Sequence, residues 1–140
     1  MKKIDIAFMA GFFEGEGCIS ICRYLDKGNR KQMYLRVAIS QTNEWIINWF
    51  QWNFGGSVNK MGRKPQEKQR WQLAITGKKA LCFLEVVLPY LKLKRAEAEL
   101  GIEFQKRKRG SGHYLKVADS VLQEADRVRM AHLKNRPIIS

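Results

Sequence analysis

The sequence has few acidic residues, cysteines, histidines and prolines, and it contains no long apolar run. Its 140 residues include 13 Asp and Glu, 3 Cys, 2 His and 3 Pro. No apolar stretch reaches the roughly 20 residues that are needed to cross a bilayer. The segment after Met1-Lys2-Lys3 shows no cleavage-site pattern before Glu14. These absences argue against a membrane-spanning or secreted protein, and we expect an intracellular, cytoplasmic location, with an organellar or phage-encoded origin also compatible.

The cysteine pattern does not predict a disulfide scaffold or a structural zinc site. Cys18, Cys22 and Cys82 are odd in number and lack Cys-x-x-Cys spacing. A disulfide scaffold or a structural zinc site needs cysteines that can pair at short spacing. We therefore expect reduced thiols.

Positive charge is what the sequence has in excess. There are 26 Lys and Arg, the formal net charge is +13, and the isoelectric point is about 10.0. Both halves of the chain are basic, and 45% hydrophobic residues are enough to build a core. The length is that of one domain. We predict a basic globular domain that binds a polyanion, first of all nucleic acid. A membrane surface and a ribosome-type structural role are the alternatives.

Helical and strand patterns alternate along the chain. The first helix is predicted to begin near Asp5, which would cap it while Ile4 packs on Met9, and to end at Gly17. The next helix starts at a cap of Thr42 or Asn43. Four tryptophans follow the periodicity of core residues: Trp45, Trp49, Trp52 and Trp71.

Strands are predicted near 18–24, 32–40, 57–62 and 69–76, and further helices near 78–88, 96–106 and 117–133. This order predicts an α+β fold in which helices back one sheet.

The predicted strands have one apolar face and one polar, aromatic, thiol or basic face. Basic loops at the strand ends and Arg, Gln and Asn side chains between them suit phosphate contacts at a rim and base contacts in a major groove. An ordinary solvated sheet face is the alternative. The predicted outward residues are Ser20, Cys22, Tyr24, Gln32, Tyr34, Arg36, Asn59, Met61, Arg70 and Gln72, and the loop residues are Lys27, Arg30, Lys31, Arg63, Lys64 and Lys68.

Glu14 and Glu16 are an anomaly in so basic a chain. Both lie where the first helix gives way to a strand, and Gly15 and Gly17 expose the backbone around them. Carboxylate and carbonyl oxygens together are ligands for a hard divalent cation. A pair of solvent-exposed glutamates is the alternative.

Residues 9–17, Met-Ala-Gly-Phe-Phe-Glu-Gly-Glu-Gly, resemble the nine-residue LAGLIDADG motif of a family of homing endonucleases. The order of elements over about 4–108 is similar to the family's αββαββα fold, with one antiparallel four-stranded sheet. Residues 111–140 are then a C-terminal helical extension. We expect residues 1–140 to form a single domain.

The resemblance implies roles for particular residues. It implies that Glu16 binds the catalytic metal with help from the Gly15 carbonyl, and that Glu14 is structural. The metal would be Mg2+ by default, with Mn2+ or Ca2+ as substitutes. Gln41 resembles a glutamine that positions metal-bound water, and Lys94 resembles a lysine that supports the active site. The motif helices of two subunits would pack through Ala10, Gly11, Phe12, Glu14 and Gly15.

The resemblance therefore implies a homodimeric endonuclease that makes metal-dependent double-strand breaks at a long pseudo-palindromic DNA target. Its partners would be double-stranded DNA and a second copy of itself, with no membrane and no small-molecule substrate. The alternative is a nucleic-acid-binding module on the same fold with a lapsed active site, such as an RNA-splicing maturase or a DNA-binding regulator.

Overall fold

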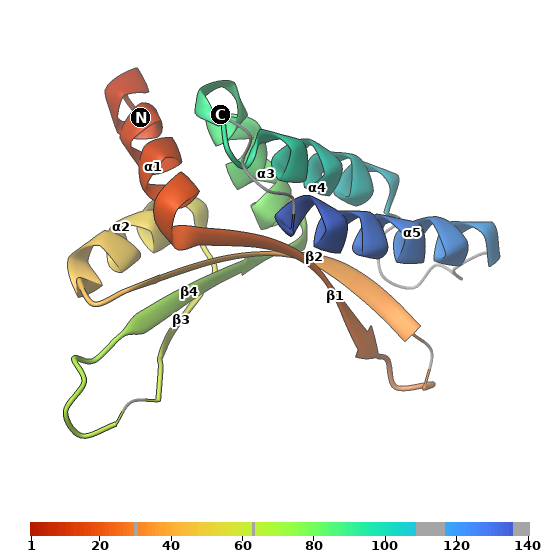
Figure 1. Cartoon of the computed structure of the whole chain (residues 1–140), viewed down its shortest axis with the longest axis horizontal. Coiled ribbons are helices and arrows are strands. Elements are labelled where there is room, and N and C mark those ends of the chain that lie inside the picture. The colour runs from red at the N-terminus through yellow and green to blue at the C-terminus, as the bar shows by residue number, and fades with distance from the viewer. Residues whose placement is uncertain (30, 63, 109–116, 136–140) are drawn as a thin grey trace.

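A computed structural model describes residues 1–29, 31–62, 64–108 and 117–135, with backbone alone for 117 and 118. The order of elements confirms the predicted α+β class (Figure 1). The elements are α1 Lys3–Glu16, β1 Gly17–Leu25, β2 Lys31–Gln41, α2 Glu44–Phe54, β3 Ser57–Lys60, β4 Trp71–Thr76, α3 Gly77–Val87, a 3-10 turn Leu88–Tyr90, α4 Arg95–Arg107 and α5 Val117–Lys134.

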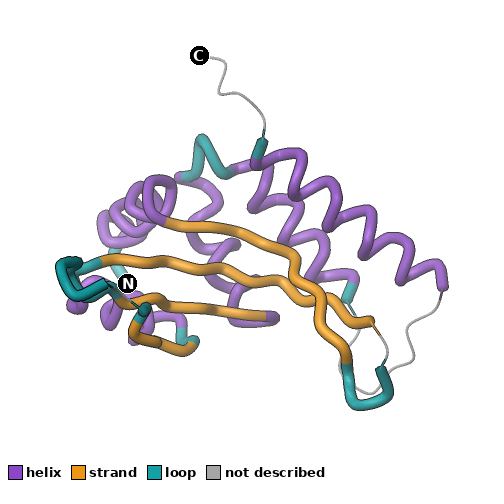
Figure 2. The backbone as a smooth tube through the Cα atoms, turned by 60° about the horizontal axis from the view of Figure 1, so that its bottom comes forward, coloured by secondary structure: helices purple, strands orange, loops and turns teal. Residues whose placement is uncertain are grey.

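The four strands form one antiparallel sheet in the order β1-β2-β4-β3. Gly17 lies opposite Ile39, and Gln41 lies opposite Trp71. The sheet is arched, and the helices lie on its convex side (Figure 1). Turning the molecule shows the strands running side by side beneath the helices, and no described helix lies on their other face (Figure 2). The described helices therefore leave the concave face open.

The core lies between the sheet and the helices. Alternate apolar residues of β1 and β2 are buried, as their sequence pattern predicts, and aromatic side chains of α1, α2 and α3 pack on them. Met130 of α5 is 2% exposed and belongs to the same core. The core thus includes the last described helix. Its largest members are Phe13, Phe50, Phe83, Phe104, Met9, Ile19, Leu35, Ile39, Ile47, Leu73, Ile75 and Leu84.

The predicted start of the first helix is wrong and that of the second is confirmed. Lys2, not Asp5, is the N-cap of α1, and no side chain caps it. Ile4 is 74% exposed, so it does not pack on Met9 as a staple. In α2, by contrast, the Asn43 side chain accepts a hydrogen bond from the Ile46 amide at 3.2 Å, which satisfies a free donor of the first turn.

Two further expectations are corrected. Strands β3 and β4 are shorter than predicted, and Met61 and Gln69 lie just beyond them. The Gln69 side chain donates to the Met61 carbonyl at 2.9 Å, which holds the ends of the hairpin together. Trp45 and Trp52 are not core residues, because they are 67% and 89% exposed.

No helix in the described parts of the chain is long and apolar enough to cross a membrane.

Candidate functional site

The motif helix runs into the sheet without a loop, since α1 ends at Glu16 and β1 begins at Gly17. A Cβ on Gly17 would overlap the ring of Phe13, a core residue of α1. Only glycine therefore allows the strand to start directly after this helix. The junction fixes the last motif residues at the end of the sheet where β2 finishes.

Glu14 is held by the segment that precedes α4. Its Oε1 accepts hydrogen bonds from the backbone N–H groups of Lys92 and Lys94. The Nζ of Lys94 donates in return to the backbone oxygen of Glu14 at 2.8 Å. These contacts bring Lys94 to the end of the motif helix, and the structural role of Glu14 stays a prediction.

Glu16 differs from Glu14 in its exposure and its contacts. It is exposed, and no hydrogen bond or ion pair joins its side chain to another described residue. The C-terminal end of a helix carries a partial negative charge that disfavours a carboxylate. Two carboxylates at this end therefore create a local negative potential within a chain of net charge +13. The site attracts a cation, and Lys94 supplies one on the Glu14 side only.

The oxygen atoms at this helix end suit a hard cation that is only partly enclosed. The described residues contain no group of three or more His, Cys, Asp or Glu that could hold a metal by themselves. Mg2+ commonly binds through one or two carboxylates and completes its coordination with waters and substrate phosphates. A carboxylate at Glu16 and the carbonyl at Gly15 fit this kind of site.

Gln41 lies near this end of the sheet, but its side chain points its oxygen elsewhere. It is two residues beyond Ile39, which pairs with Gly17. Its Oε1 accepts hydrogen bonds from the Thr42 amide at 2.7 Å and from the Thr42 hydroxyl at 3.0 Å. The structure thus brings Gln41 close along the backbone without joining it to Glu16, and its role stays a prediction.

The register of the sheet places the predicted outward residues on the concave side. Directly opposite residues share a face, so Cys22 lies beside Tyr34, and Asn59 lies beside Gln72. The rings of Tyr24 and Tyr34 are in contact, with centroids 5.6 Å apart. Arg30 and Arg63 lie outside the described residues. The remaining predicted positions are exposed or half-buried: Ser20, Cys22, Tyr24, Lys27, Lys31, Gln32, Tyr34, Arg36, Asn59, Met61, Lys64, Lys68, Arg70 and Gln72.

Ser40 and Thr76 also lie on this face, although they are not among the residues predicted from the sequence to point outward. The Ser40 side chain bonds to that of Gln72, and Thr76 lies opposite Arg36. Alternation from Arg36 reaches position 40 in β2, and alternation from Gln72 reaches position 76 in β4. Strand periodicity was therefore the signal, although both residues are small.

The predicted interface residues of α1 fall into two groups. A Cβ at Gly11 or at Gly15 would meet no described atom within 4 Å, so packing among the described residues does not require either glycine. Ala10 has no exposed surface and faces its own core. Phe12 is half-buried, and its ring packs on Phe50 at 5.7 Å. Of the five predicted interface residues, only the two glycines are exposed.

An exposed aromatic face on α2 continues the open side of α1. Trp45, Trp49 and Trp52 lie one helical turn apart on one face of α2. The rings of Trp45 and Trp49 stack at 5.7 Å with an interplanar angle of 14°. Phe8 of α1, which is 54% exposed, packs on Trp49 at 5.9 Å. We call Phe8, Trp45, Trp49 and Trp52 the aromatic face.

Cys18 follows the motif directly, and a lysine from α5 modifies its chemistry. The Nζ of Lys134 lies 3.2 Å from Cys18 Sγ and 2.9 Å from Ser20 Oγ. Burial raises the pKa of the Cys18 thiol, but the hydrogen bonds of Ser20 and Lys134 and the charge of Lys134 outweigh burial. The pKa of Cys18 therefore lies below its ordinary value.

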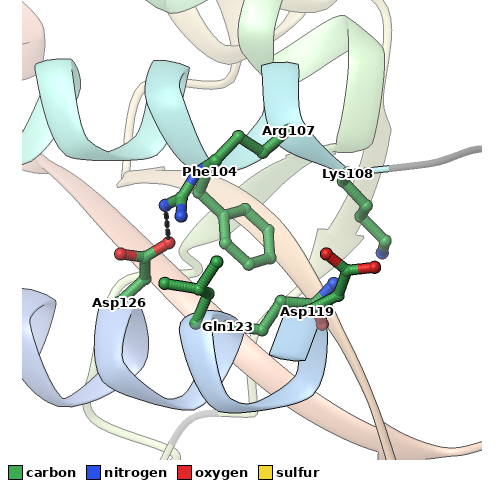
Figure 3. Close-up of a pocket in the computed structure, with 7 residues that line it drawn as sticks. Phe104, Arg107, Lys108, Asp119, Gln123 and Asp126 are labelled. Carbon is green, nitrogen blue, oxygen red and sulfur yellow. Dashed lines mark hydrogen bonds and ion pairs between the residues drawn. The ribbon is translucent and has the colours of Figure 1, made fainter. Parts of the chain in front are cut away.

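A small polar cavity lies between α4 and α5 (Figure 3). Its volume is about 30 Å³, which is room for a bound water and not for an organic ligand. Arg107 forms an ion pair with Asp126 across it, and the Asp119 and Gln123 side chains each contain a buried oxygen without a hydrogen-bond partner among the described residues. The cavity belongs to the packing of α5. It is lined by Phe104, Arg107, Lys108, Asp119, Leu122, Gln123 and Asp126.

Comparisons with known proteins agree with this geometry. A family model for the LAGLIDADG endonucleases matches residues 9–108 of the chain. A comparison with curated proteins finds no match.

Several solved structures share the fold. The homing endonuclease I-CvuI in complex with its target and 2 mM Ca has a TM-score of 0.77 and 22% identity, covering 98% of this chain and 86% of that chain. I-CvuI in complex with an I-CreI target and 2 mM Mg, with the DNA not cleaved, has a TM-score of 0.72 and 26% identity, covering 99% and 87%. The archaeal intron-encoded homing endonuclease I-Vdi141I, complexed with DNA, has a TM-score of 0.76 and 14% identity, covering 99% and 89%.

Proposed function

The chain belongs to the LAGLIDADG endonuclease family, and on that premise we propose that it is a metal-dependent homing endonuclease that breaks both strands of a long pseudo-palindromic DNA target as a homodimer. The observation that carries the proposal is the state of Glu16. It is a carboxylate without a partner among the described residues, at a helix end that disfavours it, beside a concave sheet face rich in polar and basic side chains.

In the proposed reaction the chain supplies position and charge. Glu16 and the Gly15 carbonyl would hold Mg2+, with Mn2+ or Ca2+ as substitutes, and the ion when bound polarises a phosphate and lowers the pKa of a water. Lys94, fixed on the backbone of Glu14 at 2.8 Å, would bring positive charge near the developing negative charge of the phosphate. Gln41 would orient water after turning away from Thr42.

The concave face would bind the DNA. Its rim lysines, Lys27, Lys31 and Lys64, would contact phosphates, and its central polar side chains would face a groove. A dimer carries twice the net charge of +13, so its affinity should fall steeply as salt is added.

A second copy would cover the open side of α1 and the aromatic face. Gly11 and Gly15 leave room for another helix backbone to approach closely, and no contact with the described residues explains their small size. Exposed tryptophans of this number are unusual on a monomer and mark an interaction surface. A two-fold dimer would place one Glu16 for each DNA strand. Met130 in the common core supports a single domain over residues 1–140.

The test is cleavage of a randomised duplex library by the purified protein in Mg2+, with EDTA as the control, while sedimentation measures its mass on DNA. The proposal expects metal-dependent double-strand breaks that enrich a pseudo-palindromic sequence, and a complex with two chains. Binding without cleavage in both Mg2+ and Mn2+ would establish the lapsed binding module instead. A complex that retains one chain of 16.3 kDa would contradict the dimer.

A further inference from the structure

Hydrogen bonds connect the outward side chains at the middle of the concave face. The Nη2 of Arg36 donates to Gln72 Oε1 at 3.2 Å, and Gln72 Nε2 donates to Ser40 Oγ at 3.4 Å. The Nη2 of Arg70 donates to the Ser40 backbone oxygen at 3.4 Å. The first two bonds link β2 to β4, and the third joins β2 to the residue before β4. They lie on the side away from the helices, so they do not contribute to the packing of the core.

The neighbours of Arg36 on the two adjacent strands have short side chains. Ser20 and Thr76 lie opposite it on the two neighbouring strands, and Ala38 faces Ala74 at the next outward position. Because Gln72 lies beyond this alanine pair, the side chains of Arg36 and Gln72 must meet above it. This explains why Ala38 is only 6% exposed on an open face. Arg36 is thus the longest side chain in this part of the sheet.

The guanidinium of Arg36 is held but not neutralised. No ion pair joins it to a carboxylate within the described ranges, and its one hydrogen bond to a side chain there goes to Gln72. A guanidinium has five donors, so a pair of adjacent donors stays available. Arg23, on the opposite face of the sheet, differs because Glu124 lies 4.0 Å from it. Two parallel donors match O6 and N7 of guanine in the major groove.

Gln72 differs from Arg36, because both polar atoms of its amide already form hydrogen bonds. The oxygen accepts from Arg36 and the nitrogen donates to Ser40. The oxygen and the nitrogen each keep a second hydrogen-bonding site, but the amide could turn towards a base only by breaking these two bonds. Its amide is instead placed to fix the direction of the arginine.

We propose that Arg36 reads a guanine in each half of the DNA target, and that Gln72, set by Ser40, is a positioning residue that acts through Arg36. The proposal rests on the proposed function, because it requires the concave face to lie in a DNA groove. It changes the expected part of Gln72, which the strand pattern alone would place among the base-reading residues.

The experiment selects bound duplexes from a randomised library in EDTA, so that binding is measured apart from cleavage. The variants are Arg36→Ala, Arg36→Lys, Gln72→Ala and the double alanine variant, with Arg23→Ala as the matched control on the other face. Arg36→Ala should lose a guanine preference of about 10-fold at one base pair of each half-site. Arg36→Lys should keep most of the affinity and lose the same preference, because it retains charge without the planar fork.

Gln72→Ala should weaken the preference at the same base pair, and the double variant should lose no more than Arg36→Ala alone. The control should keep the wild-type profile. A Gln72→Ala effect at a different base pair would make Gln72 a reader itself and overturn its positioning role. Unchanged preferences in Arg36→Ala would overturn the assignment of guanine while leaving the endonuclease proposal standing. Failure of the wild-type chain to select any duplex would instead defeat the proposed function.

Discussion

Charged side chains lie at two places, the contact between α4 and α5, which we call the seam, and the end of α1. They differ in whether the charge is paired within the chain. In the seam, Arg107 and Asp126 pair with each other, and Asp126 is 8% exposed. At the end of α1, Glu16 is exposed and joins no described partner. The charge of Asp126 is accounted for by its ion pair within the chain. Packing does not explain the exposed charge of Glu16 at a helix end that disfavours it, and this is the charge for which we propose a metal.

Glu14 sharpens this difference, because it lies two residues from Glu16 on the same helix. Its carboxylate accepts hydrogen bonds from two backbone amides. Like Asp126 and unlike Glu16, it therefore has partners within the chain. The two glutamates have the same chemistry and nearly the same place in the sequence. Their different contacts allow structural and functional roles to be separated by experiment.

The largest expected effect on stability comes from Glu14. Glu14→Ala should lower the free energy of unfolding by about 1–3 kcal/mol, because it removes a charged acceptor of two amides. Glu16→Ala should leave the stability unchanged or raise it by about 0.3–1 kcal/mol, because it removes an anion from a helix C-terminus. Urea denaturation measures both. A larger loss of stability for Glu16→Ala than for Glu14→Ala would reverse the comparison.

A smaller effect is expected in the seam, and it depends on pH. Burial raises the pKa of Asp126, while the charge of Arg107 opposes the rise. The folded chain therefore holds this proton more tightly than the unfolded chain, so the contribution of Asp126 to stability is greatest in acid and declines as pH rises through its raised pKa. Asp126→Asn should flatten that dependence.

At neutral pH the same variant should remain within about 1 kcal/mol of the wild type, because Arg107 keeps access to solvent when its partner loses charge. Thermal unfolding at a series of pH values checks both expectations. A steeper pH dependence in Asp126→Asn, or a loss of about 3 kcal/mol or more, would show that the ion pair itself holds the seam.

The smallest effect concerns Cys18, which lies between the two regions because α5 reaches it with Lys134. Lys134→Ala should raise the pKa of the Cys18 thiol and slow its alkylation several-fold near neutral pH, since the thiolate is the reactive form. Mass spectrometry after iodoacetamide treatment measures this rate, and Cys82 in the same chain is the control. Equal rates for Cys18 in the two proteins would exclude this influence of Lys134.

The sequence allowed the sheet and its faces to be predicted because strand alternation is a local pattern. The apolar residues of β2 are buried, and Asn43 caps α2 as expected. Trp45 and Trp52 were misassigned for a physical reason. Helical periodicity identifies an apolar face, but it does not tell whether the same chain or a second chain covers that face.

The site was less accessible to local patterns. Lys94 meets Glu14 across 80 residues, and only resemblance to a family indicated that the two segments belong together. The bond between Arg36 and Gln72 depends on the register of β2 against β4, which side-chain alternation does not fix. The turn of Gln41 towards Thr42 is a rotamer choice, which residue type alone leaves open.

The most direct measurement is the rate at which Glu16→Gln breaks a duplex that the wild type has selected, compared with Glu103→Gln, a matched change at an exposed glutamate of α4. Binding of the duplex is measured on the same preparations. If Glu16 holds the catalytic metal, Glu16→Gln should bind the duplex but cleave it about 1,000-fold more slowly or not at all, while Glu103→Gln should cleave like the wild type. Cleavage by Glu16→Gln at the wild-type rate would contradict a catalytic role for Glu16.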